Sequence, residues 1–473
     1  MKEISTDICI IGGGAAGLSM ASGAAQMGAK TILFESGKMG GDCLNYGCIP
    51  SKTLISSAKA VYHMQDLEKK GIFISSKPTI NFNEVTKNVS KVIDKIAPHD
   101  SEIRFKKLGV NVIREHAKFT AKNEISSNSV KVNFKYAVIA TGTKPIIPEI
   151  KGLDDLPYFT NETIFSLAEL PSHLIIIGGG SIGMELAQAF NRLGAQVSVI
   201  ESKGLLRNQD TEFTKAIRKM LVSEGIIFYE RTSIDSIMSK NKEIVIKTKK
   251  KLITGSHILV SAGRLINTKA IGLEKAGVIE KNGLINTNSR LQTNNKRIYA
   301  IGDVVTSNRH TNLASEHATV ALKNILLKIP AKINTKIIPT TIYIEPELSQ
   351  VGYTKKAAER EFGAQNIICI RKKFKTNDRC ITEGSLNGLV QLVAKRNGKL
   401  IGATIFAPYA GELIQSCTFA ITQKLKLSAL ARLSFPYPSY GETIKNAASA
   451  FYSKALFGEK MNWLIKLRFM LLP

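Results

Sequence analysis

The feature that most constrains the fold of this 473-residue chain is a dinucleotide-binding pattern that occurs twice. The first copy reads Gly12-Gly13-Gly14-Ala15-Ala16-Gly17. An apolar run at residues 7–11 precedes it, and a helix-forming stretch, a second apolar run at 30–34 and an acid, Glu35, follow. In such a unit the glycines let the backbone approach a pyrophosphate at the helix N-terminus, and the acid accepts hydrogen bonds from a ribose. The pattern predicts a parallel strand–helix–strand unit that binds a dinucleotide.

The same unit returns with every matching position 166 residues further on. Gly178-Gly179-Gly180-Ser181-Ile182-Gly183 repeats the glycine run, and Glu201 repeats Glu35. Two complete units in one chain predict two dinucleotide sites. We expect a tightly held flavin at one and a nicotinamide at the other. Two ATP-type sites are less favoured, because the chain has no G-x-x-x-x-G-K-[ST] phosphate loop.

A pair of cysteines, Cys43 and Cys48, is the strongest sign of chemistry. On a regular helix their offset puts them about 7.5 Å apart along the axis and roughly 140° apart around it. A disulfide between them would therefore need a turn, for which Gly47 supplies the freedom. Pro50 suits the first turn of a helix, which we expect over residues 51–70, and Cys48 then lies just ahead of the helix, where the dipole favours a thiolate. Two ordinary loop thiols are the alternative.

The surrounding run from Gly40 to Lys52 reads GGDCLNYGCIPSK. It resembles the redox-active disulfide motif of the class I pyridine nucleotide–disulfide oxidoreductases, a flavoprotein family that includes dihydrolipoyl dehydrogenase, glutathione reductase and mercuric reductase. The resemblance covers nearly the whole chain. It implies an α/β fold with two Rossmann-type domains, one binding FAD and one binding NAD(P), and a C-terminal α+β dimerisation domain. The expected boundaries are 1–149 with 266–336 for the FAD domain, 150–265 for the NAD(P) domain and 337–473 for the dimerisation domain.

The resemblance also implies roles for individual residues. A nicotinamide reduces the flavin, the flavin reduces the Cys43–Cys48 disulfide, and the dithiol reduces a substrate. Cys48 is expected to face the flavin as a thiolate and Cys43 to attack the substrate, while Lys52 pairs with Glu185 near the flavin. The expected cofactor-binding residues, besides Lys52, are Gly12, Gly14, Gly17, Glu35, Ala117, Thr141, Gly142, Gly178, Gly180, Gly183, Glu201, Gly263, Arg264, Gly302, Asp303 and Ala314.

The C-terminal segment bears on the substrate. In the family's dimers each active site takes residues from the partner's C-terminal segment, where lipoyl and glutathione enzymes carry a histidine and a glutamate. This chain has Tyr437 at the histidine position and Glu442 at the acid position, and its last histidine is His317. Tyrosine, with a pKa near 10, is a poor base at pH 7, and mercuric reductases look similar in having tyrosine here. We therefore expect weak turnover of lipoamide and of glutathione disulfide.

These observations predict an FAD-containing, NAD(P)H-dependent oxidoreductase that acts on a disulfide or a soft metal ion. A mercuric reductase-like enzyme is favoured, and dihydrolipoyl dehydrogenase is the alternative. We expect NAD(H) rather than NADP(H), because Glu201 suits a ribose 2′-hydroxyl and repels a 2′-phosphate, although Lys203 and Arg207 could reach a phosphate. No resident metal site is expected. A non-catalytic, membrane-associated flavin-binding redox protein is the alternative from another functional class.

Composition narrows the setting. The net charge is +27, but the lysines are spread out and no aromatic–basic interleaving indicates a nucleic-acid partner. Six cysteines are too few for a disulfide scaffold, and the first residues lead straight into a strand, so we expect a cytoplasmic protein. The family resemblance implies that it is a homodimer. No apolar run approaches the length of a transmembrane helix. For the apolar stretch at 461–473, interface packing is favoured over contact with a membrane surface, because its charges are scattered around a helical wheel.

Overall fold

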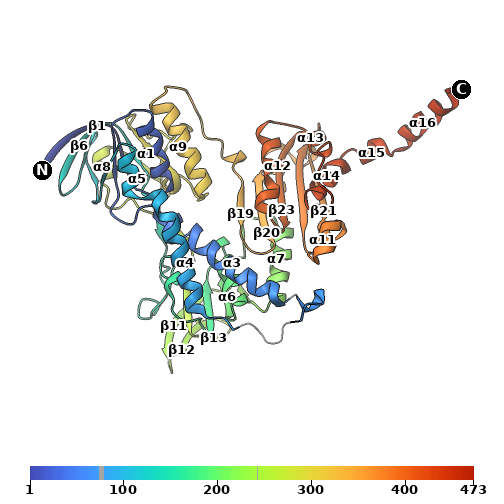
Figure 1. Cartoon of the computed structure of the whole chain (residues 1–473), viewed down its shortest axis with the longest axis horizontal. Helices are drawn as coiled ribbons and strands as arrows, with labels where there is room; N and C mark the ends of the chain where they lie inside the picture. The colour runs from blue at the N-terminus through green and yellow to red at the C-terminus, as the bar shows by residue number, and fades with distance from the viewer. Residues whose placement is uncertain (66, 74–78, 242, 473) are drawn as a thin grey trace. The chain divides into compact units, whose positions relative to one another are not determined.

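The computed structural model describes residues 1–65, 67–73, 79–241 and 243–472. It contains two compact units (Figure 1). The first consists of Met1–Leu205 and Met220–Ile333, and the second of Leu206–Lys219 and Asn334–Pro473. Each unit mixes helices with a sheet, as the predicted α/β fold class requires. The three domain boundaries given above stay a prediction.

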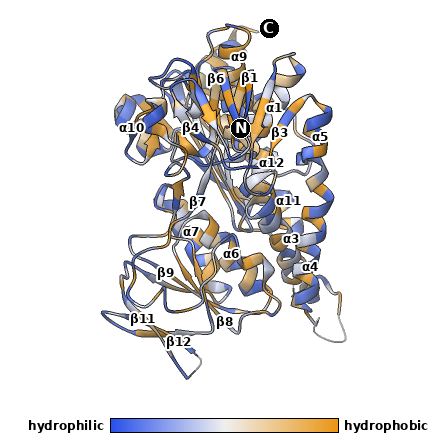
Figure 2. Ribbon diagram, turned by 90° about the vertical axis from the view of Figure 1, so that its left-hand side faces the viewer, coloured by the Kyte–Doolittle hydropathy of each residue, from blue (hydrophilic) through white to orange (hydrophobic). Residues whose placement is uncertain are grey.

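The first unit is built on a sheet whose central strands are parallel. These strands are apolar on both faces, as expected when helices or other strands cover both sides, and Figure 2 shows the hydrophobic residues along β1 and β6. Helices α1 (Ala15–Gln26) and α9 (Thr311–Ile325) pack against one face. In spatial order the sheet contains β3 (Val110–Ile113), β2 (Thr31–Phe34), β1 (Lys2–Ile11), β6 (Val130–Ile139), β5 (Glu124–Ser126) and β4 (Lys118–Ala121), with β18 (Ile298–Ala300) also paired to β6.

A second parallel sheet in this unit carries the repeated pattern. Its strands are β10 (Ile227–Glu230), β9 (Gln196–Glu201), β8 (His173–Ile177) and β14 (His257–Val260). Helix α6 (Ser181–Arg192) connects β8 to β9, as α1 connects β1 to β2. The two glycine-rich sequences therefore form equivalent strand–helix–strand units, as predicted. A short antiparallel pair, β7 (Thr143–Pro145) and β15 (Arg264–Ile266), lies where the chain crosses between the two sheets.

The helices that follow the cysteine motif differ from the expected bounds. The helix expected at 51–70 is α3 (Cys48–Gln65), so Cys48 is its first residue rather than a residue ahead of it. Pro50 falls in the first turn, where the missing N–H has no helical partner to lose. The helical region that follows is divided: α4 (Phe82–Ile96) ends before Pro98, and α5 (Glu102–Lys107) begins after a short 3₁₀ turn.

The second unit is an antiparallel sheet covered by helices. Its strands, in spatial order, are β19 (Thr340–Ile342), β20 (Glu347–Gly352), β23 (Leu400–Ala407), β22 (Leu389–Lys395) and β21 (Ile367–Lys373). The helices α12 (Ala410–Thr422), α13 (Leu427–Ala431) and α14 (Gly441–Ala450) contribute to its core. Beyond them follow α15 (Ser453–Leu456) and α16 (Glu459–Leu471). Within the described part of the chain, no helix combines the length and apolarity needed to cross a membrane.

A buried ion pair fixes α6 in the first unit. Arg192 donates to both carboxylate oxygens of Glu224 at 2.9 Å, and the two side chains are only 5% and 8% exposed. The Arg192 guanidinium also lies 3.7 Å from the ring centroid of Tyr62 on α3. These contacts hold α6 against α3, the two helices that carry Glu185 and Lys52.

Glu224→Ala leaves the Arg192 charge buried without this carboxylate. We expect the variant to lower the free energy of unfolding of the first unit by about 3–5 kcal/mol, measured by urea denaturation of the FAD-loaded protein. The matched control is Glu359→Ala, which removes the half-exposed carboxylate that pairs with Lys355 at 3.6 Å on the surface of the second unit. It should change stability by less than about 1 kcal/mol. Equal losses in the two variants would contradict the role given to the buried pair.

Candidate active site

The first glycine-rich turn has the shape of a dinucleotide cradle. Gly12 has φ of +111°, and a Cβ added there would lie 2.3 Å from the carbonyl oxygen of Ala140. A Cβ on Gly17 would lie 1.8 Å from the carbonyl oxygen of Gly12, so neither position accepts a side chain. Helix α1 begins after Gly14 without a side-chain cap. Its first N–H groups are therefore available to an anion at the helix N-terminus.

The second turn repeats this construction. Gly178 has φ of +120°, and its added Cβ would lie 2.5 Å from the carbonyl oxygen of Ser261. A Cβ on Gly183 would lie 2.1 Å from the carbonyl oxygen of Gly178. Helix α6 begins after Gly180, again without a side-chain cap. Two turns that exclude side chains at corresponding positions, each opening an uncapped helix, fit two dinucleotides.

The two strand-end acids are held in the same way. Glu35 accepts hydrogen bonds from the backbone N–H groups of Gly13 at 2.6 Å and Gly37 at 2.5 Å, one to each carboxylate oxygen. Glu201 accepts from the two equivalent backbone positions, both at 2.8 Å. Each carboxylate is therefore fixed beside its glycine turn.

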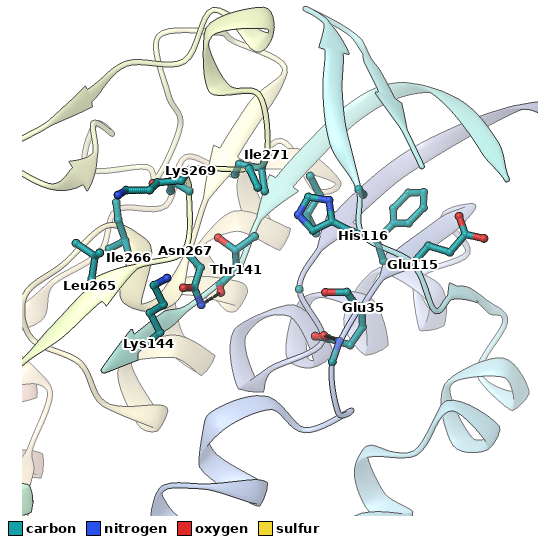
Figure 3. A pocket seen from close by; sticks show the side chains of 18 residues that line it. Glu35, Glu115, His116, Thr141, Lys144, Leu265, Ile266, Asn267, Lys269 and Ile271 are labelled. Atoms are coloured by element: carbon teal, nitrogen blue, oxygen red, sulfur yellow. Dashed lines mark hydrogen bonds between the residues drawn. The ribbon is translucent and has the colours of Figure 1, made fainter. Parts of the chain in front are cut away.

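A cavity of about 370 Å³ lies at the first cradle. Figure 3 shows Glu35, His116, Thr141 and Asn267 around it, and Ala117 also lines it. The Thr141 hydroxyl is buried and, among the residues that the structure describes, has no hydrogen-bond partner. A buried orphan hydroxyl in the wall of a cavity marks a position where a ligand can supply the missing partner. The cavity, the cradle and Glu35 together fit the adenosine part of a dinucleotide.

Other expected cofactor residues gather in the same unit. Asp303 follows β18 and accepts a hydrogen bond from the Thr143 hydroxyl at 3.0 Å, and burial raises the pKa of its carboxyl group. Ala314 is buried on α9. The glycines at 142, 263 and 302 all have positive φ, at +64°, +142° and +74°.

The two cysteines meet at the junction of two helices. Cys43 lies in α2 (Gly41–Asn45) and Cys48 begins α3, and in this structure both are thiols that share a hydrogen bond. The expected turn is present between them, but Gly47 is not in the left-handed region. It provides space instead, because a Cβ there would lie 2.9 Å from a carboxylate oxygen of Asp42. Our expectation that Gly47 supplies backbone freedom is corrected accordingly.

The surroundings separate the pKa values of the two thiols. The hydrogen bond from Cys43, the Thr311 hydroxyl at 3.2 Å from its sulfur and the positive charge of Lys52 lower the pKa of Cys48 to about 6, although burial opposes them. The same hydrogen bond, together with burial, raises the pKa of Cys43. The site therefore holds a thiolate at Cys48 and a thiol at Cys43 at neutral pH.

Lys52 and Glu185 form the expected ion pair. Lys52 Nζ lies 2.8 Å from Glu185 Oε2, and their side chains are 36% and 7% exposed. Lys52 is on α3, one turn beyond Cys48, and Glu185 is on α6, the helix of the second cradle. The pair therefore links the cysteine motif to the second dinucleotide site.

Several residues of the site were not predicted. Arg264, expected at the cofactor, donates to Asp42 Oδ1 at 2.8 Å and to the Thr143 hydroxyl at 2.7 Å. Asn161 donates to the same Asp42 oxygen at 3.1 Å. Thr311, Asp42 and Asn161 come from segments far apart in the sequence, and no motif spacing links them. Of these residues only Asp42 belongs to the cysteine motif, where it occupies a position that accepts any residue.

A second cavity, of about 340 Å³, opens beside the thiol pair. Among the described residues of its wall is Cys43, but not Cys48. Asp100 and Arg104, from the interrupted helical region, contribute opposite charges, and burial raises the pKa of the Asp100 carboxyl group. The less acidic thiol is thus the one that faces open space.

The two predicted residues of the C-terminal segment, Tyr437 and Glu442, lie in the second unit. The Tyr437 side chain is 73% exposed, and its hydroxyl donates to Asp378 Oδ2 at 2.9 Å. This hydrogen bond raises the pKa of Tyr437. Glu442, in the first turn of α14, accepts instead from the backbone N–H of Ser439 at 3.3 Å. Within the described residues, no group of three or more His, Cys, Asp or Glu side chains is arranged to hold a metal ion.

Comparison with known proteins agrees with this geometry. Residues 6–323 match the sequence model described as "Pyridine nucleotide-disulphide oxidoreductase", and residues 338–448 match the dimerisation domain of the same family. Mercuric reductase of Streptomyces lividans is 30% identical over 94% of this chain and 96% of its own length. Dihydrolipoyl dehydrogenase of Staphylococcus aureus is 32% identical over the same shares, 94% and 96%.

Solved structures share the fold. The Cu(II) complex of the HOCl-induced flavoprotein disulfide reductase RclA from Escherichia coli superposes with a TM-score of 0.84 at 23% identity, covering 94% of this chain and 99% of that one. LpdA from Mycobacterium tuberculosis gives a TM-score of 0.86, also at 23% identity, over 94% of this chain and 99% of its own. The chain belongs to the pyridine nucleotide-disulphide oxidoreductase family and is an FAD-dependent oxidoreductase of the flavoprotein disulfide reductase kind.

Proposed function

We propose that the chain is an NADH-dependent flavoprotein reductase that works through Cys43 and Cys48 and acts on a soft metal cation in preference to lipoamide. The observation that carries the proposal is the unequal thiol pair. Cys48 is stabilised as a thiolate by Cys43, Thr311 and Lys52, while Cys43 faces a cavity. Both dinucleotide cradles lie in the same unit as this pair.

The residues present fit both cofactors. FAD would be held at the first cradle by Glu35, Thr141 and Asp303, and a nicotinamide dinucleotide at the second by Glu201. Bound FAD supplies the route by which the electron pair of a reduced nicotinamide reaches the Cys43–Cys48 disulfide. The chain's own contribution is to position these groups and to fix the charge around the sulfurs.

The two thiols have different tasks in substrate reduction. Cys43, deprotonated, attacks one sulfur of a disulfide substrate, forms a mixed disulfide and releases the other sulfur as a thiolate. The Cys48 thiolate then attacks Cys43, which restores the intramolecular disulfide and releases the second half of the substrate. A soft metal cation would instead be held by the two sulfurs, since thiolates are its preferred ligands. Lys52, fixed by Glu185, supplies a positive charge that favours Cys48 as thiolate.

The C-terminal segment supports the preference for a metal cation. Removing the Cys43 proton needs a base, and the last histidine of the chain is His317, ahead of the second unit's sheet. Tyr437 stands where the family's histidine belongs, and its hydrogen bond to Asp378 makes it a still poorer base. Mercuric reductase is among the relatives, and the similar RclA structure is a Cu(II) complex. Dihydrolipoyl dehydrogenase remains the second candidate, because a relative of that name is 32% identical.

The family's dimerisation domain suggests that the protein is a homodimer. We propose that each active site receives Tyr437 and Glu442 from the partner chain.

A substrate panel on the FAD-loaded protein tests the function: lipoamide, glutathione disulfide, Hg(II), Cu(II) and quinones, each with NADH. Fast turnover of Hg(II) or Cu(II) with slow turnover of lipoamide supports the proposal. If NADH does not bleach the flavin absorbance, the protein is instead a non-catalytic flavin-binding protein.

The Cys48 thiolate should be visible in its reactivity. We expect alkylation of Cys48 by iodoacetamide in the reduced protein, followed by peptide mass spectrometry, to reach half its maximal rate at a pH near the pKa of about 6. The thiolate is present above that pH and protonated below it. Lys52→Met removes a nearby positive charge and should move the midpoint upward. Lys59→Met, two turns further along α3, is the control and should leave it unchanged. A midpoint near an ordinary thiol pKa in the unmodified protein would contradict the assignment.

The choice of nicotinamide follows from Glu201. We expect a lower KM for NADH than for NADPH, because the carboxylate repels a 2′-phosphate. Glu201→Gln keeps an oxygen acceptor and removes the charge. The variant should reduce the ratio of the KM for NADPH to the KM for NADH roughly tenfold, which corresponds to about 1.4 kcal/mol of removed repulsion. Steady-state kinetics with both nucleotides measure the effect, and a clear preference of the unmodified enzyme for NADPH would refute the assignment.

Tyr437 sets the expected weakness with lipoamide. Tyr437→His introduces a base whose pKa lies near neutrality, and general-base catalysis contributes about 10²–10⁴-fold. We expect lipoamide reduction to rise toward that range and to follow the titration of the new histidine. Tyr437→Phe removes the hydroxyl without adding a base and should give no gain. If the unmodified enzyme already reduces lipoamide as fast as the histidine variant, Tyr437 is not limiting.

A further inference from the structure

Helix α16 is the part of the described chain with the most apolar surface left open. None of its thirteen residues is buried. Trp463 is 61% exposed, Phe469 72%, Met470 80% and Leu471 76%. Figure 1 shows the helix extending away from the sheet of its own unit. Seven large apolar side chains exposed on one short helix indicate a site of association.

The distribution of these side chains indicates what covers them. At 100° per residue, Trp463 and Ile465 project about 160° apart, and Leu464 and Phe469 about 140° apart. A helix docked on a second copy of the chain would bury one such face and leave the others in water. A lipid phase covers apolar side chains on every side of a helix at once. The all-round pattern therefore favours a bilayer over a protein groove.

The charges on α16 match an anionic surface. The helix carries three basic residues, Lys460, Lys466 and Arg468, and one acidic residue, Glu459. The long stems of lysine and arginine can run along the apolar surface while their charged ends reach lipid headgroups. The whole chain carries a net charge of +27, which adds a long-range attraction to the same kind of surface. Trp463 belongs to the residue type that prefers the boundary between lipid and water.

The length of α16 limits how it can bind. Thirteen residues extend about 20 Å, whereas a helix that spans a bilayer must cross about 30 Å of hydrocarbon. We propose that α16 anchors this flavoprotein reversibly to the surface of an anionic lipid membrane by entering one leaflet. Helix α16 carries none of the residues assigned to the redox site, so this contact does not depend on the substrate.

The test uses Trp463, which is the only tryptophan in the chain, so its fluorescence reports on α16 alone. The full-length, FAD-loaded protein is titrated with vesicles of phosphatidylcholine, with or without phosphatidylglycerol. We expect Trp463 emission to shift to shorter wavelength, and the protein to sediment with the vesicles, when phosphatidylglycerol is present. Each basic residue near an anionic surface contributes roughly fivefold in affinity, so three predict a preference of about a hundredfold over neutral vesicles.

Matched variants separate the contributions. Phe469→Gln with Leu471→Gln keeps the charge and should weaken binding by about a hundredfold or more. Lys466→Gln with Arg468→Gln should weaken it roughly thirtyfold. The control Leu252→Gln changes an equally exposed apolar residue, 67% exposed, in the first unit, and should bind like the unmodified protein. Reduction of the flavin by NADH in solution should be the same in all of them.

Three results would overturn the proposal. If the wavelength of Trp463 emission does not change when vesicles are added, α16 does not enter lipid. Emission already shifted in the absence of vesicles, with a dependence on protein concentration, shows that a second copy covers the helix. Vesicle binding that the double glutamine variant of Phe469 and Leu471 retains shows that another surface makes the contact.

Discussion

The ion pair between Lys52 and Glu185 is the interaction on which the site depends. It joins α3, which begins at Cys48, to α6, which begins at the second glycine-rich turn. An exposed pair of this kind would contribute little to stability. Here Glu185 is nearly buried, and the buried contact of Arg192 with Glu224 holds the far end of the same helix. The pair therefore acts by fixing a positive charge near Cys48 rather than by adding much to the stability of the fold.

Much of this architecture could be predicted from the sequence, because the signals are local. Gly17 and Gly183 must be glycines for a reason that acts within one turn, because a Cβ at either position would meet the carbonyl oxygen of Gly12 or of Gly178. Glu35 and Glu201 follow at the strand ends that such a unit requires. The cysteines and the helix that follows them were likewise predicted from one continuous stretch of sequence, the motif from Gly40 to Lys52. The prediction that Gly47 supplies backbone freedom was wrong. Its φ is not positive, and its lack of a side chain leaves room for the Asp42 carboxylate.

The rest of the site arises from contacts between distant segments. Thr311 reaches Cys48 across 263 positions of sequence, and Arg264 reaches Asp42 across 222. No periodicity or motif spacing encodes such contacts, because only the packing of α9 and of β15 against the cysteine loop creates them. The break between α4 and α5 is a related case. A single proline, Pro98, divides a run that otherwise has the pattern of one helix.

The two thiols differ mainly because they share a hydrogen bond, which lowers the pKa of Cys48 and raises the pKa of Cys43. The Thr311 hydroxyl favours the thiolate at both sulfurs and the charge of Lys52 favours it at Cys48, whereas Asp42 opposes the ionisation of both. Arg264 lies against Asp42 and offsets part of that opposition without coming between the sulfurs. A thiolate at Cys48 makes the protonated Cys43 the thiol that must lose a proton before it can attack. Cys43 lines the second cavity, so its proton can leave into that open space. A disulfide substrate cannot assist this step, whereas a metal cation lowers the pKa of the thiol that it binds, so metal binding can deprotonate Cys43 without a separate base.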